Sequence, residues 1–208
     1  MPTTNLWAET YQIDSAHSSV GFEIRHFLND VSGHFSNFTG TIDYDSKNPK
    51  NMNIKGEVQV ESINTGVEKR DSHLKSADFF DLSNPKKPEY QHIRFQSKKI
   101  KKVTQKKENT QAILIGDLTI HGITKEVALD LEIRGPAKDP FGNIKIAVDA
   151  SGVVNRKDFG LNWSAPVEAG NILVGEDVKI QLKTQAIQEA AKKEAQDAEV
   201  KKPAKLKS

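Results

Sequence analysis

Histidine is the side chain of this sequence best suited to chemistry, since it can bind a metal or exchange a proton near neutral pH. The chain has six, at His17, His26, His34, His73, His92 and His121. No two of them stand four residues apart, the spacing that places two metal ligands on one face of a helix. A solitary histidine is more often packed or solvated than functional. We therefore predict no metal site and no resident cofactor.

Nucleophilic and phosphoryl-transfer chemistry have equally little support. Ser18 stands beside His17 but lacks the glycine-flanked turn that presents a catalytic serine. Asp71 and His73 are two residues apart, which on a helix does not bring them face to face. Residues 158–160 spell the kinase motif Asp-Phe-Gly without a glycine-rich loop or a catalytic loop. The chain has no cysteine, which excludes thiolate catalysis and disulfides. We predict no catalytic residues.

The charge of the chain is nearly balanced, with 30 basic and 28 acidic residues and a formal charge of +2. Lysines concentrate in two segments, residues 98–107 and 201–207. Such runs usually serve solubility, and the functional alternative is transient docking on an anionic membrane surface, at about 1 kcal/mol per lysine. No aromatic residues are interleaved with these lysines, so we exclude nucleic acid as a partner.

Strands must position any site, because apolar residues recur with a period of two through most of the chain. The clearest case is residues 112–133, where two alternating runs predict an antiparallel hairpin with a short connection at residues 121–124. Gly33 is interpreted as a turn or bend. We expect further strands at residues 20–28, 35–44 (with a bulge), 52–60, 90–97, 144–148 and 178–186.

About eight strands, one short helix at residues 67–76 and no βαβ alternation predict an all-β fold, a single antiparallel β-barrel. The domain would span residues 11–186, after a lead at residues 1–10 and before a charged, partly helical or disordered segment at residues 187–208. With 208 residues the chain is long enough to bury one core, and no apolar run reaches membrane-spanning length, so we expect a soluble protein.

One parity of the strands is apolar and would face the inside of the barrel. Its members are Val20, Phe22, Ile24, Ile42, Met52, Ile54, Val58, Phe95, Leu114, Leu118, Leu129 and Leu131. An antiparallel barrel of about eight strands either fills with such side chains or holds one slender ligand. Parity alone leaves both arrangements open.

Six blocks of sequence, taken together and in order, resemble the YceI-like family of lipid-binding proteins. Each block is weak by itself, but six in sequence from about residue 11 to residue 186 are specific. The blocks read IDSAHSSVGFEIRH (13–26), GHFSNFTGTID (33–43), RDSHLKSADFFD (70–81), GDLTIHGITKEVALDL (116–131), RKDFGLNW (156–163) and VGEDVKIQL (174–182).

This resemblance implies an extended, lipocalin-like barrel that sheathes a long apolar chain, such as a polyisoprenoid, an isoprenoid quinone or a fatty-acid derivative. The ligand would lie along the inner face. The matching blocks imply a mouth formed by Arg70, His73, Lys75, Phe79, Phe80, Asn155, Arg156 and Trp163. A basic mouth attracts a phosphate or polarises a quinone carbonyl. Alternatively, Arg70 and Arg156 anchor loops through backbone or carboxylate contacts.

We therefore predict non-enzymatic binding or carriage of a long-chain isoprenoid or acyl lipid. The alternatives are a histidine-dependent small-molecule enzyme or stress protein, and a structural β-domain with a filled core. A homodimer stays open. Many members of the family carry an export signal, and the first residues here show none, so the expected location is the cytoplasm, or the periplasm if a signal was trimmed.

Overall fold

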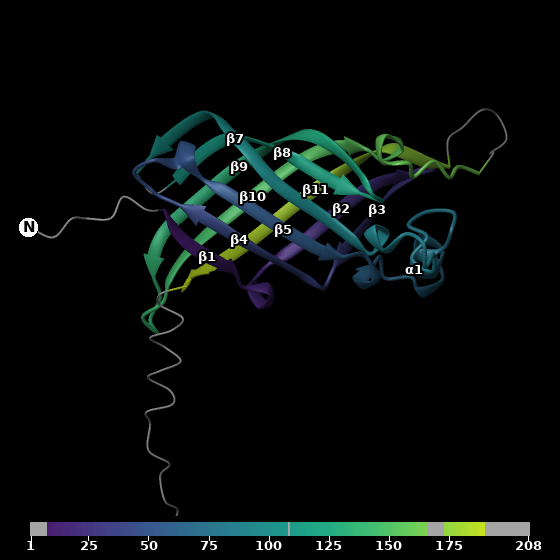
Figure 1. Cartoon of the computed structure of the whole chain (residues 1–208), viewed down its shortest axis with the longest axis horizontal. Coiled ribbons are helices and arrows are strands. Elements are labelled where there is room, and N and C mark those ends of the chain that lie inside the picture. The colour runs from purple at the N-terminus through teal and green to yellow at the C-terminus, as the bar shows by residue number, and fades with distance from the viewer. Residues whose placement is uncertain (1–7, 108, 166–172, 190–208) are drawn as a thin grey trace, which may run out of the picture.

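A computed structural model describes residues 8–107, 109–165 and 173–189 of the chain (Figure 1). The strands are β1 (Glu9–Ile13), β2 (Ser19–His26), β3 (Asn29–Phe35), β4 (Phe38–Tyr44), β5 (Asn53–Gln59), β6 (Ile63–Asn64), β7 (His92–Lys106), β8 (Asn109–Ile120), β9 (Ile123–Lys138), β10 (Ile144–Asn155) and β11 (Val174–Gln188). The helices are α1 (Glu68–Lys75) and the 3₁₀ turns η1 (Ser15–His17), η2 (Pro49–Asn51), η3 (Val60–Ser62), η4 (Pro88–Gln91) and η5 (Arg156–Phe159). In the described part of the chain no helix is both long and apolar enough to span a membrane.

Eight strands close into an antiparallel barrel, in the order β1-β4-β5-β7-β8-β9-β10-β11, and β1 pairs with β11 to complete the ring. The predicted barrel with one short helix is confirmed. Strands β7, β9 and β11 contain 15, 16 and 15 residues. At about 3.3 Å per residue and a tilt of about 40°, such strands span about 35–40 Å along the barrel axis. The barrel is therefore elongated (Figure 1).

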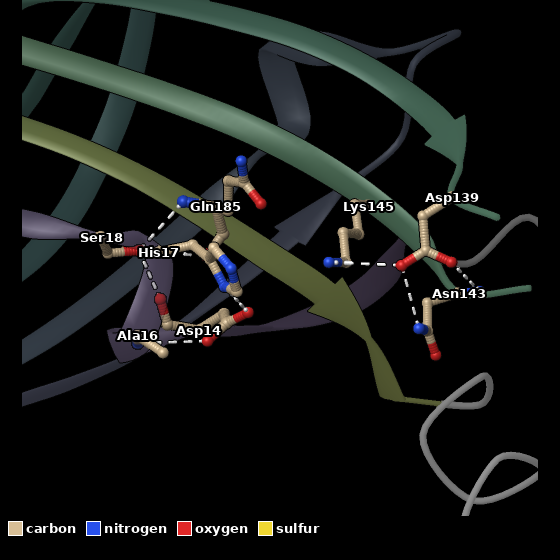
Figure 2. A network of polar contacts seen from close by, with 8 residues as sticks. All are labelled: Asp14, Ala16, His17, Ser18, Asp139, Asn143, Lys145 and Gln185. Atoms are coloured by element: carbon tan, nitrogen blue, oxygen red, sulfur yellow. Dashed lines mark hydrogen bonds and ion pairs between the residues drawn. The ribbon is translucent and has the colours of Figure 1, made fainter. Parts of the chain in front are cut away.

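A polar network joins the turn between β1 and β2 to β11 (Figure 2). β1 pairs with the C-terminal part of β11 and β2 with the rest, and η1 lies between them. The Asp14 carboxylate accepts the backbone N–H of Ala16, and the Ser18 hydroxyl donates to the Asp14 carbonyl at 2.7 Å and accepts the N–H of Gln185 at 3.0 Å. These bonds satisfy backbone groups that the break between β1 and β2 would otherwise leave unpaired.

The region around β3 differs from the sequence prediction. The strand expected at residues 20–28 ends at His26, because Phe27 takes φ 52° and the chain reverses into β3. Gly33 lies inside β3, not at a turn. The strand with a bulge expected at residues 35–44 is two strands, β3 and β4, which pair with different neighbours. Phenylalanine rarely occupies the left-handed region, so the sequence carries no turn signal there.

The central hairpin predicted at residues 112–133 is confirmed as β8 and β9. Its connection is only two residues, His121 at φ 52° and Gly122 at φ 74°, because Ile123 and Thr124 already pair with β8. β7 continues to Lys106, well beyond the strand expected at residues 90–97. Register shifts between Ser97 and Lys99 and between Lys101 and Thr104 interrupt its alternation, which hides this part of the strand from a period-two search.

Buried side chains close the end of the barrel that lies away from α1. They belong to the largest core cluster, and we call them the plug: Tyr11, Tyr44, Met52, Ile133, Ile146 and Ala186. Burial, with smaller contributions from Glu9 and Tyr44, raises the pKa of the Tyr11 hydroxyl to about 12. A second cluster, which includes Phe35, Val60, Ile63, Phe80 and Leu161, lies toward α1. The space between the two clusters contains the candidate site.

Candidate binding cavity

The barrel encloses a cavity of about 320 Å³. That volume lies within the range of about 300–1,000 Å³ usual for ligand pockets. The inner row of apolar side chains predicted from parity lines it, with the exception of Met52. Met52 follows η2 and precedes β5, so it is not on the inner row of a strand, and its side chain is buried in the plug. The barrel interior is thus partly open, and the residues expected to face inward surround the open part.

Glycines on the inner face explain why large side chains do not fill this space. A methyl group added at Gly33 would lie 2.3 Å from Cζ of Phe22, and one at Gly116 would lie 2.3 Å from Cζ of Phe95. Each ring therefore occupies the space of a missing side chain and stays close to the barrel wall. Four such pairs occur: Phe22 with Gly33, Ile13 with Gly40, Phe95 with Gly116, and Leu129 with Gly152. The inward parity of these glycines is readable from the sequence, but their pairing with larger side chains is not.

Three rings from separate blocks of sequence meet at the end of the cavity near α1. The His73 ring packs edge-on against Trp163 and Phe79, with centroid separations of 4.9 and 5.2 Å. Phe79 and Trp163 are 5.1 Å apart, and all three rings, with Phe80, line the cavity. We call this end the mouth, bounded by α1, η5 and the β2–β3 turn (Figure 1). The blocks at residues 70–81 and 156–163 are adjacent in space, as the resemblance implied.

Two arginines line the mouth without an ion pair to any described carboxylate. Arg156 is only 4% exposed, and it donates to the carbonyls of Leu161, Gly175 and Val174, the last two at 2.8 and 3.3 Å. Burial lowers the pKa of its guanidinium, against an opposing effect of Glu176. Arg70 donates to the hydroxyl and the carbonyl of Thr65 at 2.7 and 2.9 Å.

The remaining arginines of the chain are arranged differently. Each pairs with one or more carboxylates on the outside of the barrel: Arg25 with Asp30, Arg94 with Glu57, and Arg134 with Glu132 and Asp149. The contacts of Arg70 and Arg156 match the predicted anchoring role, since both bind backbone. Carbonyl dipoles do not cancel a full charge, so neither guanidinium is neutralised by these backbone contacts.

Two residues predicted at the mouth lie outside the cavity wall. The Lys75 ammonium pairs with Glu61 at 2.9 Å. Asn155 caps η5 by accepting the N–H of Lys157 at 3.0 Å, and its amide reaches Glu176. The predicted head-group residues that do line the cavity are Arg70, His73 and Arg156.

The histidines occupy separate parts of the barrel, and among the described residues no group of three or more His, Cys, Asp or Glu side chains could hold a metal ion. His17 pairs with Asp14 at 2.8 Å on the surface (Figure 2). His92 lies 3.0 Å from Glu57. The His121 ring stacks on Tyr90 at 3.5 Å, and burial lowers its pKa. His73, at the mouth, lies 2.8 Å from the Asp78 carboxylate.

The model of the YceI-like domain matches residues 11–186 of the chain. The chain belongs to the YceI-like family. A UPF0312 protein of Staphylococcus aureus strain N315 is 34% identical to this chain over 173 residues. The match covers 82% of this chain and 93% of the relative. The corresponding protein of strain MSSA476 is 33% identical over the same shares. The family predicted from the six blocks is confirmed.

Solved structures of the YceI-like fold agree. The YCEI protein of Campylobacter jejuni is 28% identical, with a TM-score of 0.63, covering 91% of this chain and 99% of that one. Two more distant structures share the fold. BcnA of Burkholderia cenocepacia has 18% identity, a TM-score of 0.66 and coverage of 83% and 98%. A polyisoprenoid binding domain from Saccharophagus degradans has 14% identity, a TM-score of 0.63 and coverage of 86% and 98%.

Proposed function

We propose that this protein binds or carries a long-chain isoprenoid-type lipid, without catalysing a reaction on it. The observation that carries the proposal is the apolar cavity of about 320 Å³ along the inside of an elongated barrel. The ligand class, which takes in polyisoprenoids, isoprenoid quinones and fatty-acid derivatives, fits a slender apolar space. The fold shared with a domain described as polyisoprenoid binding supports the same class.

The energetics suit a ligand with few polar groups. Burying one methylene group contributes about 0.8 kcal/mol in gross transfer free energy, so a long chain needs few hydrogen bonds for affinity. The ordering of a flexible chain offsets much of this gain. Selectivity then depends on the shape of the cavity and on the chemistry of the mouth.

The ligand would enter with its chain toward the plug and its head group at the mouth. The plug is apolar and buried, whereas Arg70, His73 and Arg156 provide polar atoms at the opposite end. A guanidinium group binds phosphate or carboxylate oxygens well, and it also polarises a quinone carbonyl. The orientation is therefore set by charge at one end only.

The other functions that the sequence left open have weaker support. A histidine-dependent enzyme needs its histidines near one another or near a nucleophile, and His17, His92 and His121 each have a separate local partner. A structural domain with a filled core is hard to reconcile with the cavity and with the glycines of the inner wall.

The test is uptake of an added isoprenoid quinone by purified wild type and by Leu118→Trp. Leu118 lines the cavity, so the larger indole should occupy ligand space and weaken uptake at least tenfold, about 1.4 kcal/mol. Val153→Trp is the matched control, because Val153 is exposed on the outside of the barrel. Circular dichroism confirms that both variants fold. Equal uptake by all three proteins would place the ligand elsewhere and refute the proposal.

A further inference from the structure

Exposed apolar side chains gather at the mouth. Four of the large hydrophobic residues with exposed side chains lie on its turns and caps: Phe27 and Leu28 in the β2–β3 turn, Val67 at the start of α1, and Ile123 after the β8–β9 turn. At the opposite end Phe141 is exposed in the β9–β10 turn, and Val153 lies on the side of the barrel. Among the described residues, more of the exposed large hydrophobic side chains therefore lie at the mouth than at the opposite end.

The β2–β3 turn is the most prominent of these features, and we call Phe27 and Leu28 the hairpin tip. Leu28 is 73% exposed and Phe27 is 42% exposed. Phe27 is held at φ 52° by two hydrogen bonds: its N–H donates to Leu173 at 2.8 Å, and its carbonyl accepts Nε of Arg25 at 3.0 Å. Turns that need positive φ usually contain Gly or Asn, so a phenylalanine there places an apolar ring in water against its own conformational preference.

The hairpin tip is continuous with the cavity wall. His26 immediately before it and Val31 after it both line the cavity. A surface that covered the tip would therefore cover the edge of the mouth as well.

The charged groups around the tip neutralise one another. Arg25 pairs with Asp30 at 3.3 Å, and Lys179 pairs with Glu23 at 2.6 Å and lies 3.8 Å from Asp30. An apolar tip surrounded by paired charges suits a neutral lipid surface. The lysine run at residues 98–107 lies toward the plug, since Lys106 pairs with Asn109 at that end, and Lys98 pairs with Asp117 and Glu126. The predicted docking through those lysines would turn the mouth away from the membrane.

We propose that the hairpin tip inserts into the surface of a lipid bilayer and brings the mouth of the cavity against it. Docking would let a water-insoluble ligand pass between bilayer and barrel without crossing water. This purpose rests on the proposed function, but the docking itself does not. The driving force is burial of apolar side chains, so it should depend little on salt or on anionic lipid.

The test is co-sedimentation of the full chain with phosphatidylcholine vesicles, for wild type and for the double variant Phe27→Gly with Leu28→Ser. Glycine accepts the positive φ, so the turn is preserved. Phe141→Ser is the matched control, because Phe141 is 86% exposed in a turn at the other end. We expect the double variant to lose at least tenfold in vesicle partitioning, and Phe141→Ser to match wild type, from about 0.1 M to about 1 M salt.

A second measurement separates docking from ligand binding. Wild type and double variant are loaded with an isoprenoid quinone from detergent, and transfer of the quinone to vesicles is followed. Equal loading with slower transfer by the double variant supports the proposal. If neither protein loads quinone, the proposed function fails, yet tip-dependent sedimentation would still support docking. Three outcomes would overturn the docking proposal. Wild type could fail to sediment, it could sediment only with anionic vesicles at low salt, or wild type and double variant could behave equally.

Discussion

Arg70 and Arg156 each anchor a loop through backbone carbonyls and also line the cavity. Arg156 joins the carbonyls of Leu161 and Val174, on either side of the segment that the structure does not describe. Three carbonyl contacts fix its position but leave its charge without a described carboxylate partner. A positioned, uncompensated guanidinium beside an apolar cavity is well placed to favour an anionic head group.

The charge of Arg70 should therefore matter more for an anionic lipid than for a neutral one. We expect Arg70→Gln to weaken binding of a prenyl phosphate about tenfold, about 1.4 kcal/mol, and to change binding of the prenyl alcohol of equal chain length little. Arg94→Gln, whose arginine pairs with Glu57 outside the barrel, is the control. Titration of each variant with both ligands measures the difference. An equal loss for alcohol and phosphate would contradict a role of charge.

Asp139 is a second residue whose environment predicts a measurable effect, in this case on stability. Its carboxylate accepts the side chain of Asn143 at 3.0 Å and the N–H of Phe141 at 2.9 Å, and it lies 3.3 Å from Lys145 (Figure 2). The hydrogen bond from the Asn143 side chain is the largest cause that lowers its pKa from 3.8 to about 2. The folded state thus prefers the ionised form of this turn residue.

A folded-state pKa below the unfolded one gives stability that is complete above about pH 4 and is lost as the pH falls toward 2. Asp139→Asn should therefore lower the Tm at pH 7, and its difference from wild type should shrink between pH 4 and about 2. Asp130→Asn, which replaces an exposed carboxylate on β9, is the control. Thermal unfolding followed by circular dichroism across this range measures both. A difference from wild type that is independent of pH would show that charge is not its cause.

At the scale of the strands, glycines on the inner face determine how much of the barrel stays empty. Phe22 pairs across the β2–β3 ladder with Gly33, and its ring occupies the space beside it. The Phe95 ring likewise occupies the space beside a glycine, Gly116. A residue with a larger side chain at Gly33 would force the Phe22 ring toward the barrel axis, and one at Gly116 would meet both the Phe95 ring and the Gln96 carbonyl oxygen, the latter at 2.7 Å.

Gly33→Ala should accordingly reduce ligand uptake several-fold by pushing the Phe22 ring into the cavity. The cost in folding free energy should be modest, about 1–3 kcal/mol, because the clashing atoms belong to a side chain that can rotate. Ser32→Ala is the control, since Ser32 precedes Gly33 on β3 and its side chain is exposed on the outer face of the strand. Quinone uptake and urea unfolding together measure the two effects. Unchanged uptake by a folded Gly33→Ala protein would contradict this role of glycine.

Much of the strand arrangement could be predicted, because the inward face of each long strand is apolar and the outward face polar. The β8–β9 hairpin was readable from its alternation and from Gly122. The β2–β3 hairpin was not, because its turn is built from Phe27 and Leu28, held by hydrogen bonds to distant residues and not by turn chemistry. The far half of β7 was hidden by its register shifts.

Part of the candidate site could likewise be predicted from the sequence, and part could not. Parity predicts which way a strand residue faces, so the apolar wall of the cavity was predictable. Met52 precedes its strand, and the alternation rule does not apply to it. Parity says nothing of whether facing side chains meet, and the open centre depends on rings lying over glycines, which only the structure reveals. Lys75 and Asn155 found local partners that a motif does not specify.

At the scale of the whole molecule, the barrel has two unlike ends. Buried residues such as Tyr11 and Ile133 fill one end, and Tyr44 and Thr110 place their hydroxyls 3.5 Å apart there. The other end has the aromatic rings, the two arginines and the hairpin tip. A ligand with an apolar chain and a polar head matches this polarity. The segment predicted as a tail at residues 187–208 lies almost wholly outside the described residues, as do residues 1–7 of the lead.

The central claim is that the cavity holds a long-chain lipid, and the most direct measurement is mass spectrometry of an organic extract of the purified protein. A mock preparation lacking the protein corrects for lipids of the host. We expect one prenyl or acyl species in about stoichiometric amount, depleted in Leu118→Trp and retained in Val153→Trp. An empty extract, combined with no uptake of added isoprenoid quinone or prenyl phosphate, would contradict it.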